Sequence, residues 1–157
     1  MKSLSIATLA LLLAGTQLSS AASLIVNPSK DNTIYAESST INNGPALSNG
    51  KGVNFFAGDN GSSVARRALV AFDLSAIPAG ATIDSVSLQL TATVAAAGAQ
   101  TVSLYRLTSD WGEGTSVASG NGGGGTSATP GDATWTDAFN LGAAWTTEGG
   151  DYVLSSS

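Results

Sequence analysis

Residues 66–90 read RRALVAFDLSAIPAGATIDSVSLQL, and this stretch decides the fold class. Apolar residues alternate with Ser, Thr and Gln from residue 86 to residue 94. Successive side chains of a strand point to opposite faces, so the alternation predicts an antiparallel strand with one buried face and one hydrated face. The apolar run at residues 69–72 predicts a preceding strand, and Pro78 with Gly80 predicts the corner between the two.

Short patterns of the same kind follow one another along the rest of the chain. They predict strands at residues 24–26, 33–37, 53–57, 65–72, 82–94 and 101–107, the last two paired with each other across a turn at 95–98. The sequence GDNG at 58–61 predicts a tight turn, and the small, polar stretches 38–52 and 120–130 predict loops. Since no helical period follows residue 22, we expect an all-β domain, either an antiparallel β-sandwich or a barrel.

The first 22 residues have the organisation of a secretory signal peptide. Lys2 gives a positive end, residues 4–14 are almost wholly apolar, and Ser20-Ala21-Ala22 offers a cleavage site. The apolar run is shorter than the roughly 20 residues that span a bilayer, and no second run follows it. We therefore expect a protein that is secreted or held at the cell surface, with one mature domain over residues 23–157 and no membrane span in it.

The end of the chain resembles the beginning of a strand. Val153 and Leu154 form an apolar pair, and the sequence ends in three serines at residue 157. We expect a C-terminally incomplete copy of a longer reading frame, which would leave a sheet edge without its partner.

Composition excludes several function classes. The chain has no cysteine and no histidine, so disulfides and the usual Ser-His-Asp or Cys-His nucleophilic arrangements are excluded. The net charge of −5 argues against nucleic acid, whose phosphates require Lys and Arg. Asp110 and Glu113 are a conceivable pair of glycosidase acids, but we expect Glu113 to hold the loop after Trp111 by hydrogen bonding to backbone. We therefore expect that the protein is not an enzyme.

Four segments together resemble a known family. Residues 67–83 carry RALVAFDLSAIPAGATI, residues 110–114 carry DWGEG, residues 129–135 carry TPGDATW, and residues 149–152 carry GGDY. They are similar to the DNRLRE-type domains, also called carbohydrate-binding module family 96, over nearly the whole mature chain. The resemblance implies a jelly-roll β-sandwich on an exported protein, without catalytic activity, that binds polysaccharides, including acidic ones such as alginate.

Sugar-binding sites use aromatic faces against the pyranose ring, and Arg or Lys against a uronate carboxylate. The candidates for carbohydrate contact are Tyr105, Arg106, Arg66, Lys51, Trp111 and Trp135. Tyr35 and Trp145 are further aromatic candidates. The alternative for Trp111 and Trp135 is a place in the core or its rim. For Arg67 we expect a structural ion pair with Asp73 or Glu113 rather than a ligand contact.

We predict no cofactor and no catalytic metal. A structural calcium ion is the alternative, with oxygen ligands from Asp31-Asn32, Asp59-Asn60 and Asp132, although Asp and Asn in turns more often accept local backbone hydrogen bonds.

The favoured function is a secreted, non-catalytic module that binds a polysaccharide or a cell-surface glycan. A structural or adhesive sandwich of a surface or matrix protein, without a sugar pocket, is the alternative. A third reading is the accessory part of a polysaccharide-degrading enzyme. Surface geometry discriminates between the first two, because exposed aromatics beside a cation favour binding and buried aromatics favour structure.

Overall fold

The computed structural model describes residues 22–93 and 100–155, and this part of the chain is all-β, as predicted. Residues 1–21 of the predicted signal peptide and the turn predicted at 95–98 lie outside the described residues. The elements are β1 (Pro28–Tyr35), η1 (Ala36–Ser38), β2 (Leu47–Ser48), β3 (Gly58–Asp59), β4 (Ala65–Phe72) and β5 (Thr126–Ser127). The three-residue η1 is the only helical element described, and it is far too short to cross a membrane.

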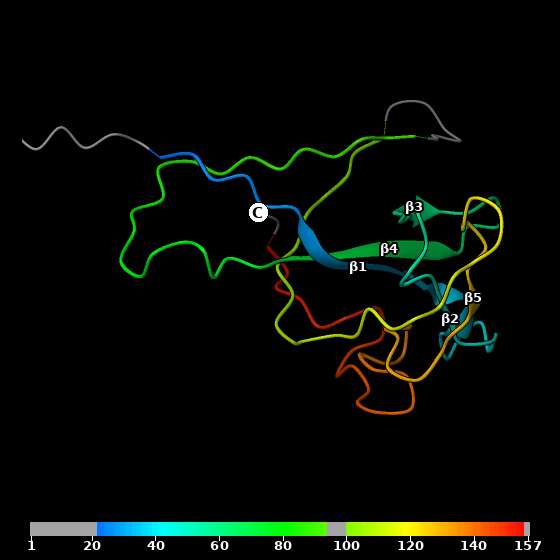
Figure 1. Cartoon of the computed structure of the whole chain (residues 1–157). Coiled ribbons are helices and arrows are strands. Elements are labelled where there is room, and N and C mark those ends of the chain that lie inside the picture. Colours follow the sequence, from blue (N-terminus) through cyan, green and yellow to red (C-terminus); the bar gives the residue numbers. More distant parts are fainter. Residues whose placement is uncertain (1–21, 94–99, 156–157) are drawn as a thin grey trace, which may run out of the picture.

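The strands form two antiparallel sheets (Figure 1). One has the order β1-β4-β3, with Tyr35 opposite Arg66 and Asn32 opposite Leu69. The other pairs β2 with β5, so that Ser48 lies opposite Thr126. The arrangement is consistent with a β-sandwich. The jelly-roll path stays a prediction, because these five strands do not trace it.

Strand β4 has the bounds that its sequence predicts, 65–72, and its central Leu69 is buried. Strand β1 begins at Pro28, earlier than the predicted 33–37, and ends at Tyr35, because residues 36–37 belong to η1. Proline lacks the N–H that a central strand donates, so it is tolerated at a first position. The register shifts between Pro28 and Lys30, which is where the ladder with β4 becomes irregular.

Four predicted strands are wrong in the described part of the chain. Residues 24–26, 53–57, 82–93 and 101–106 are not strands, and residues 82–93 do not pair with 101–107, where Leu107 makes a single bridge to Tyr152. The predicted turn at 58–61 begins with β3. A strand requires a partner edge as well as alternation, and alternation reports only which side chains could share a face.

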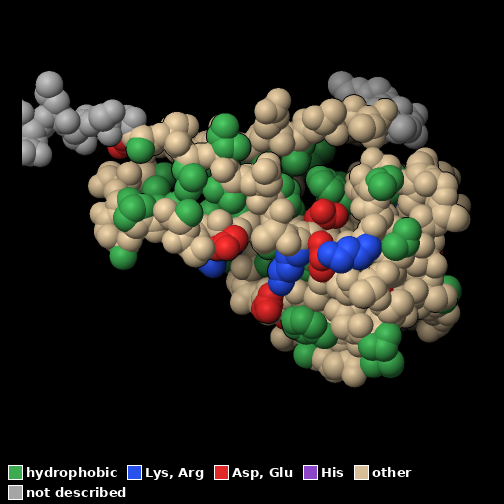
Figure 2. Space-filling view, in the orientation of Figure 1, with side chains coloured by type: hydrophobic (Ala, Val, Ile, Leu, Met, Phe, Trp, Pro, Cys, Tyr) green, Lys and Arg blue, Asp and Glu red, His purple; other side chains and the backbone are tan. Residues whose placement is uncertain are grey.

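The segment 73–93 forms an arm that runs away from the three-stranded sheet to the left and returns above the sheet (Figure 1, green). Its alternating side chains are exposed; Val86 is 86% exposed and Leu90 is 50% exposed. Figure 2 shows hydrophobic side chains on the surface of this arm. The apolar face that the sequence predicts therefore exists, but no described part of the chain covers it.

The core lies between the β1–β4 pair and the loops that follow residue 110. Ile34 and Leu69 come from the sheet, whereas Trp111, Trp135 and Trp145 come from the loops. All three tryptophans are less than 9% exposed. Aromatic burial of this size supplies much of the apolar area that stabilises a domain, so these loops are part of its structure rather than mobile connections.

Buried amide and carboxylate side chains hold the loops against the sheet where no backbone hydrogen bonds between strands do so. The fully buried Asn32 accepts hydrogen bonds at Oδ1 from Thr33 N (2.7 Å), Ser48 Oγ (2.9 Å) and Asn49 N (3.1 Å). Its Nδ2 donates to the Glu113 carbonyl at 3.1 Å. One side chain of β1 therefore ties β2 and the loop at residue 113 to the sheet.

Asp132 is a second such hub. It is fully buried and accepts hydrogen bonds from the backbone N–H groups of Thr115 at 2.8 Å and Thr129 at 2.7 Å. Gly114 has φ of +69°, and a Cβ there would overlap the Asp132 carboxylate. Glycine is required at this position both for the backbone conformation and for the close approach.

Candidate functional site

A cleft of about 360 Å³ lies between residues 108–109 and the turn 146–154. We call it the tyrosine cleft; it is lined by Thr108, Ser109, Thr146, Thr147, Gly150, Asp151, Tyr152 and Leu154. Hydroxyl groups dominate its polar lining, and Asp151 is its one ionisable carboxylate. A concave surface that combines apolar area with a few placed polar groups is the usual form of a small-ligand site.

A short antiparallel contact builds this cleft. Leu107 forms a bridge with Tyr152, flanked by hydrogen bonds from Thr108 N to the Asp151 carbonyl (2.9 Å) and from Val153 N to the Arg106 carbonyl (3.1 Å). The contact places residues separated by about 45 positions side by side, which no local sequence pattern specifies.

The Asp151 carboxylate fixes the turn that forms the other wall. It accepts hydrogen bonds from Thr146 N (3.0 Å), Thr147 N (2.9 Å) and Ser109 Oγ (3.1 Å). Hydrogen bonding to the ionised form, from the Thr146 N–H first, holds the pKa of Asp151 below its ordinary value. The cleft therefore carries a negative charge at neutral pH.

Tyr152 lines the cleft, and Tyr105 packs against Tyr152. The ring centroids of Tyr105 and Tyr152 are 5.2 Å apart, and the rings are tilted by 53°. Tyr105 is 45% exposed, and Tyr152 is half-buried. Their separation is in the range of favourable aromatic pairs, so each ring restrains the other while Tyr105 keeps an open surface.

A second hollow, of about 430 Å³, borders the same turn at Glu148. We call it the tryptophan hollow; it is lined by Ala36, Ser39, Ile41, Asn42, Ser63, Val64, Ala65, Trp135 and Glu148. Its apolar residues are Ala36 of η1, Ile41 of the loop that follows η1, Val64 and Ala65 at the start of β4, and Trp135. Glu148 lies at its rim, where both carboxylate oxygens are 3.2 Å from Thr40 N.

Arg67 connects the two sites from β4. Its guanidinium carbon lies 4.7 Å from the ring centroid of Trp135 and 5.1 Å from that of Tyr152. Its Nη1 donates to the Gly149 carbonyl at 2.6 Å. The prediction of an ion pair between Arg67 and Asp73 or Glu113 is wrong. Arg67 instead makes cation–π contacts with the rings of Trp135 and Tyr152.

Among the sequence-predicted residues, Tyr105 lies beside the tyrosine cleft through its contact with Tyr152, and Arg106 takes part through its backbone in the bridge that builds the cleft. Tyr105 supplies the exposed ring, and Arg106 is exposed and pairs through its carbonyl with Val153. Lys51 lies elsewhere, half-exposed and paired with Glu113. The structure therefore does not bring Lys51 together with the tyrosines.

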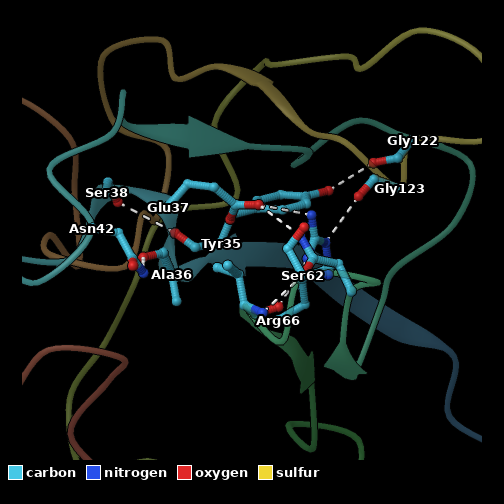
Figure 3. Close-up of polar contacts among 11 residues, drawn as sticks. Tyr35, Ala36, Glu37, Ser38, Asn42, Ser62, Arg66, Gly122 and Gly123 are labelled. Atoms are coloured by element: carbon cyan, nitrogen blue, oxygen red, sulfur yellow. Dashed lines mark hydrogen bonds and ion pairs between the residues drawn. The ribbon is translucent and has the colours of Figure 1, made fainter.

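Arg66 is used inside the fold. Its Nη2 lies 2.8 Å from Glu37 Oε1, its Nε donates to the Gly123 carbonyl at 2.9 Å, and its side chain is only 10% exposed. Figure 3 shows Arg66 and Glu37 beside the Tyr35 ring, whose hydroxyl donates to the Gly122 carbonyl. Burial above all raises the pKa of Tyr35 to about 12. This cluster secures the loop at 122–123.

The predicted tryptophans are core residues in this structure. Trp111 is 3% exposed, and Lys30 lies 4.6 Å above its ring while donating to its carbonyl. Trp135 is 8% exposed but borders the tryptophan hollow. Trp145 donates through Nε1 to the Thr134 carbonyl at 2.9 Å. Each tryptophan therefore offers far less of its face to a ligand than Tyr105 does.

Three of the acidic residues considered for catalysis or calcium, Asp110, Glu113 and Asp132, are engaged by other parts of the protein. Asp110 pairs with Lys30, and Glu113 accepts from the Asp31 N–H, which confirms its expected backbone contact. Burial and the Glu113 charge raise the pKa of Asp31. Figure 2 shows charged side chains gathered near the middle of this face.

Asn60, a turn residue proposed as a calcium ligand, serves local hydrogen bonds. Asn60 accepts from the N–H groups of Ser62 and Val64 at 2.9 Å each, which is the expected Asx geometry. Within residues 22–93 and 100–155, no group of three or more acidic side chains is placed to hold a metal ion.

Sequence reasoning did not select Asp151, Tyr152 or the threonines at 146 and 147. The sequence feature that could have indicated them is an aromatic residue, Tyr152, directly after the turn residues Gly149-Gly150-Asp151. Their role depends on the partner segment at 105–109, which is distant in sequence.

Comparison with known proteins identifies one family. The model of carbohydrate-binding module family 96 matches residues 22–119, more than half of the 157-residue chain. No curated protein and no solved structure matches the chain significantly. The match includes the residues from Tyr105 to Ser109 and ends before the turn that forms the opposite wall of the tyrosine cleft.

Proposed function

Because the chain belongs to carbohydrate-binding module family 96, a family of non-catalytic binding modules, we propose that it binds polysaccharide at the tyrosine cleft and catalyses no reaction. The observation that carries the proposal is the exposed Tyr105 ring, packed on Tyr152 beside a hydroxyl-lined cleft. The pairing of an open aromatic face with fixed polar groups is what a sugar requires.

The chemistry of the lining fits a pyranose. The apolar C–H face of a sugar ring packs on an aromatic ring, and the sugar hydroxyls exchange hydrogen bonds with side chains. Tyr105 offers the ring, and Thr108, Ser109 and Asp151 offer hydroxyl and carboxylate oxygens. The hydrogen bonds to Asp151 hold the acceptor in place before a ligand arrives, which lowers the ordering cost of binding.

We extend the proposal to acidic polysaccharides through Arg106. Lys30, Lys51 and Arg66 are each paired with a carboxylate, whereas Arg106 is exposed and makes no ion pair in the described part of the chain. A guanidinium can grip a uronate carboxylate with two parallel hydrogen bonds. Because the negative charge of Asp151 would repel a carboxylate inside the cleft, the uronate carboxylate would lie outside it, against Arg106.

An extracellular ligand accords with the sequence. The leader pattern over residues 1–22 supports export of the mature chain. An exported protein can contact the polysaccharides of cell walls and extracellular matrices. We therefore propose that the protein is secreted or located at the cell surface.

A structural or adhesive role is the second candidate, and burial of the tryptophans favours it. All three indole rings are buried in the core, so the larger aromatic surfaces stabilise the fold and are not available to a ligand. In that case the exposed tyrosines would be ordinary surface residues.

Affinity electrophoresis separates the two candidates, with alginate, polygalacturonate and a neutral β-glucan cast in separate gels. We expect retardation in at least one gel and a weakening of about tenfold for Tyr105→Ala, the worth of one aromatic contact. Phe55→Ala is the matched control, since Phe55 is an aromatic of similar exposure, 37%, that lines neither site. Folded wild-type protein that migrates freely in all three gels refutes binding, as does a Tyr105→Ala variant retarded like the wild type.

A further inference from the structure

We propose that the tryptophan hollow is a second sugar subsite, which takes an uncharged sugar unit of the chain held at the tyrosine cleft. The inference rests on the proposed function of that cleft. Nothing in the family match assigns a role to the hollow, and four of its nine lining side chains are apolar residues at the edge of the core.

The composition of the hollow fits a hydroxyl-rich ligand with an apolar face. Trp135 and Val64 provide apolar lining, and Ile41, 88% exposed, forms an open wall. Ser39, Asn42, Ser63 and Glu148 contribute the polar groups. At about 430 Å³ the hollow is within the range of small-ligand sites.

Charge in the hollow selects an uncharged unit. Glu148 is its only ionisable side chain, and neither Lys nor Arg lines it. The carboxylate accepts from Thr40 N at both oxygens, which fixes it while leaving lone pairs for sugar hydroxyls. A uronate at this position would meet a like charge without a cation, which is unfavourable by several-fold in affinity even in a hydrated site.

The two sites are close enough for one oligosaccharide. Trp135 borders the hollow, Tyr152 borders the tyrosine cleft, and both rings lie about 5 Å from the same Arg67 guanidinium. The turn 146–150 separates them, with Thr147 and Gly150 facing one site and Glu148 the other. A ligand bound at one site is therefore at high effective concentration for the other.

Gly149 keeps the wall between the sites thin. Its φ is +85°, and a Cβ there would collide with Arg67 Nη1 and with the Trp135 ring. Its N–H donates to the Trp135 carbonyl at 2.7 Å, and its carbonyl accepts from Arg67. The stacked Arg67 therefore holds the dividing turn against both rings.

Isothermal titration tests the inference with hexasaccharides of glucose (β-1,4 and β-1,3), of mannose and of mannuronate, each beside its disaccharide. The variants are Ile41→Ser and Glu148→Gln; Ile25→Ser is the control, since Ile25 is equally exposed at 88% and lines neither site. For the neutral hexasaccharide that binds best, we expect about a fivefold loss in each hollow variant, from lost apolar contact in Ile41→Ser and from a weaker acceptor in Glu148→Gln, and no change for the disaccharide. For the mannuronate hexasaccharide, Glu148→Gln should bind at least as well as wild type.

Two results overturn the subsite and leave the proposed function standing. One is wild-type protein that binds mannuronate but no neutral hexasaccharide. The other is a pair of hollow variants that bind the neutral hexasaccharide as wild type does, or lose affinity equally for the disaccharide. Loss of the proposed function has a different signature, since Tyr105→Ala would then leave every affinity unchanged.

Discussion

Replacing Asn32 with Leu tests whether buried amide hubs hold this fold together. Leucine is similar in size but has no polar atom, so the change removes the hydrogen bonds without opening a large cavity. The N–H groups of Thr33 and Asn49, the Ser48 hydroxyl and the Glu113 carbonyl would all lose a partner. Ser48 and Asn49 are themselves almost fully buried, so water cannot readily replace the amide.

The magnitude follows from these four partners. An unsatisfied buried polar group costs about 1–3 kcal/mol, so a total of about 4 kcal/mol or more is expected. Domains of this kind are stable by about 5–15 kcal/mol, which makes the loss a large share of the total. Loosening should begin where β2 and the loop at residue 113 meet β1.

Urea unfolding monitored by tryptophan fluorescence measures the effect, because all three indoles are buried. Asn27→Leu, at an exposed position just before β1, is the control for the side-chain change itself. A loss of less than about 1 kcal/mol in Asn32→Leu would refute the reasoning, since it would mean that the hub contributes no more than one average hydrogen bond.

Three further predictions concern charge and ionisation. Arg66→Ala should lower the free energy of unfolding by about 3 kcal/mol, because it leaves the Glu37 carboxylate unpaired in a largely buried site; thermal melting measures this, and a melting temperature equal to that of wild type would contradict it. Hydrogen bonds lower the pKa of Asp151 below 3.8, so the carboxylate stabilises the fold fully above that pH and loses this effect as the pH falls through the lowered pKa. Asp151→Asn should therefore be less stable at neutral pH and should lose less stability on acidification. Parallel curves of stability against pH for the two proteins would argue against this. In an ultraviolet titration, the tyrosine that ionises near pH 12 should disappear in Tyr35→Phe; its persistence would assign that pKa to another ring.

The all-β class, β4 and the family resemblance were within reach of the sequence. Strand β4 was predictable because its apolar run is bounded by turn residues on both sides. Alternation in residues 82–93 was as clear, yet no strand formed there, because pairing requires an edge that the described chain does not supply.

The candidate site divides in the same way. Tyr105 and Arg106 were predictable as an exposed ring and an adjacent cation, since they lie on one short extended segment. Tyr152 and Asp151 were not, because their contact with Tyr105 and Ser109 joins segments more than 40 residues apart. The same limit explains Arg66 and Arg67, adjacent in β4, of which one pairs with Glu37 and the other lies between two rings.

By itself, the sequence determined the residue types and their period: strand-forming runs, turn glycines, the lack of histidine and cysteine, and an exposed tyrosine beside an arginine. These are local properties, fixed by backbone geometry and side-chain chemistry within a few residues. Only the tertiary structure decided which tryptophans became core, which arginines became structural and where the two clefts lie. Those outcomes depend on burial and on partners brought together from distant parts of the chain, and both arise only when the loops close over the sheet.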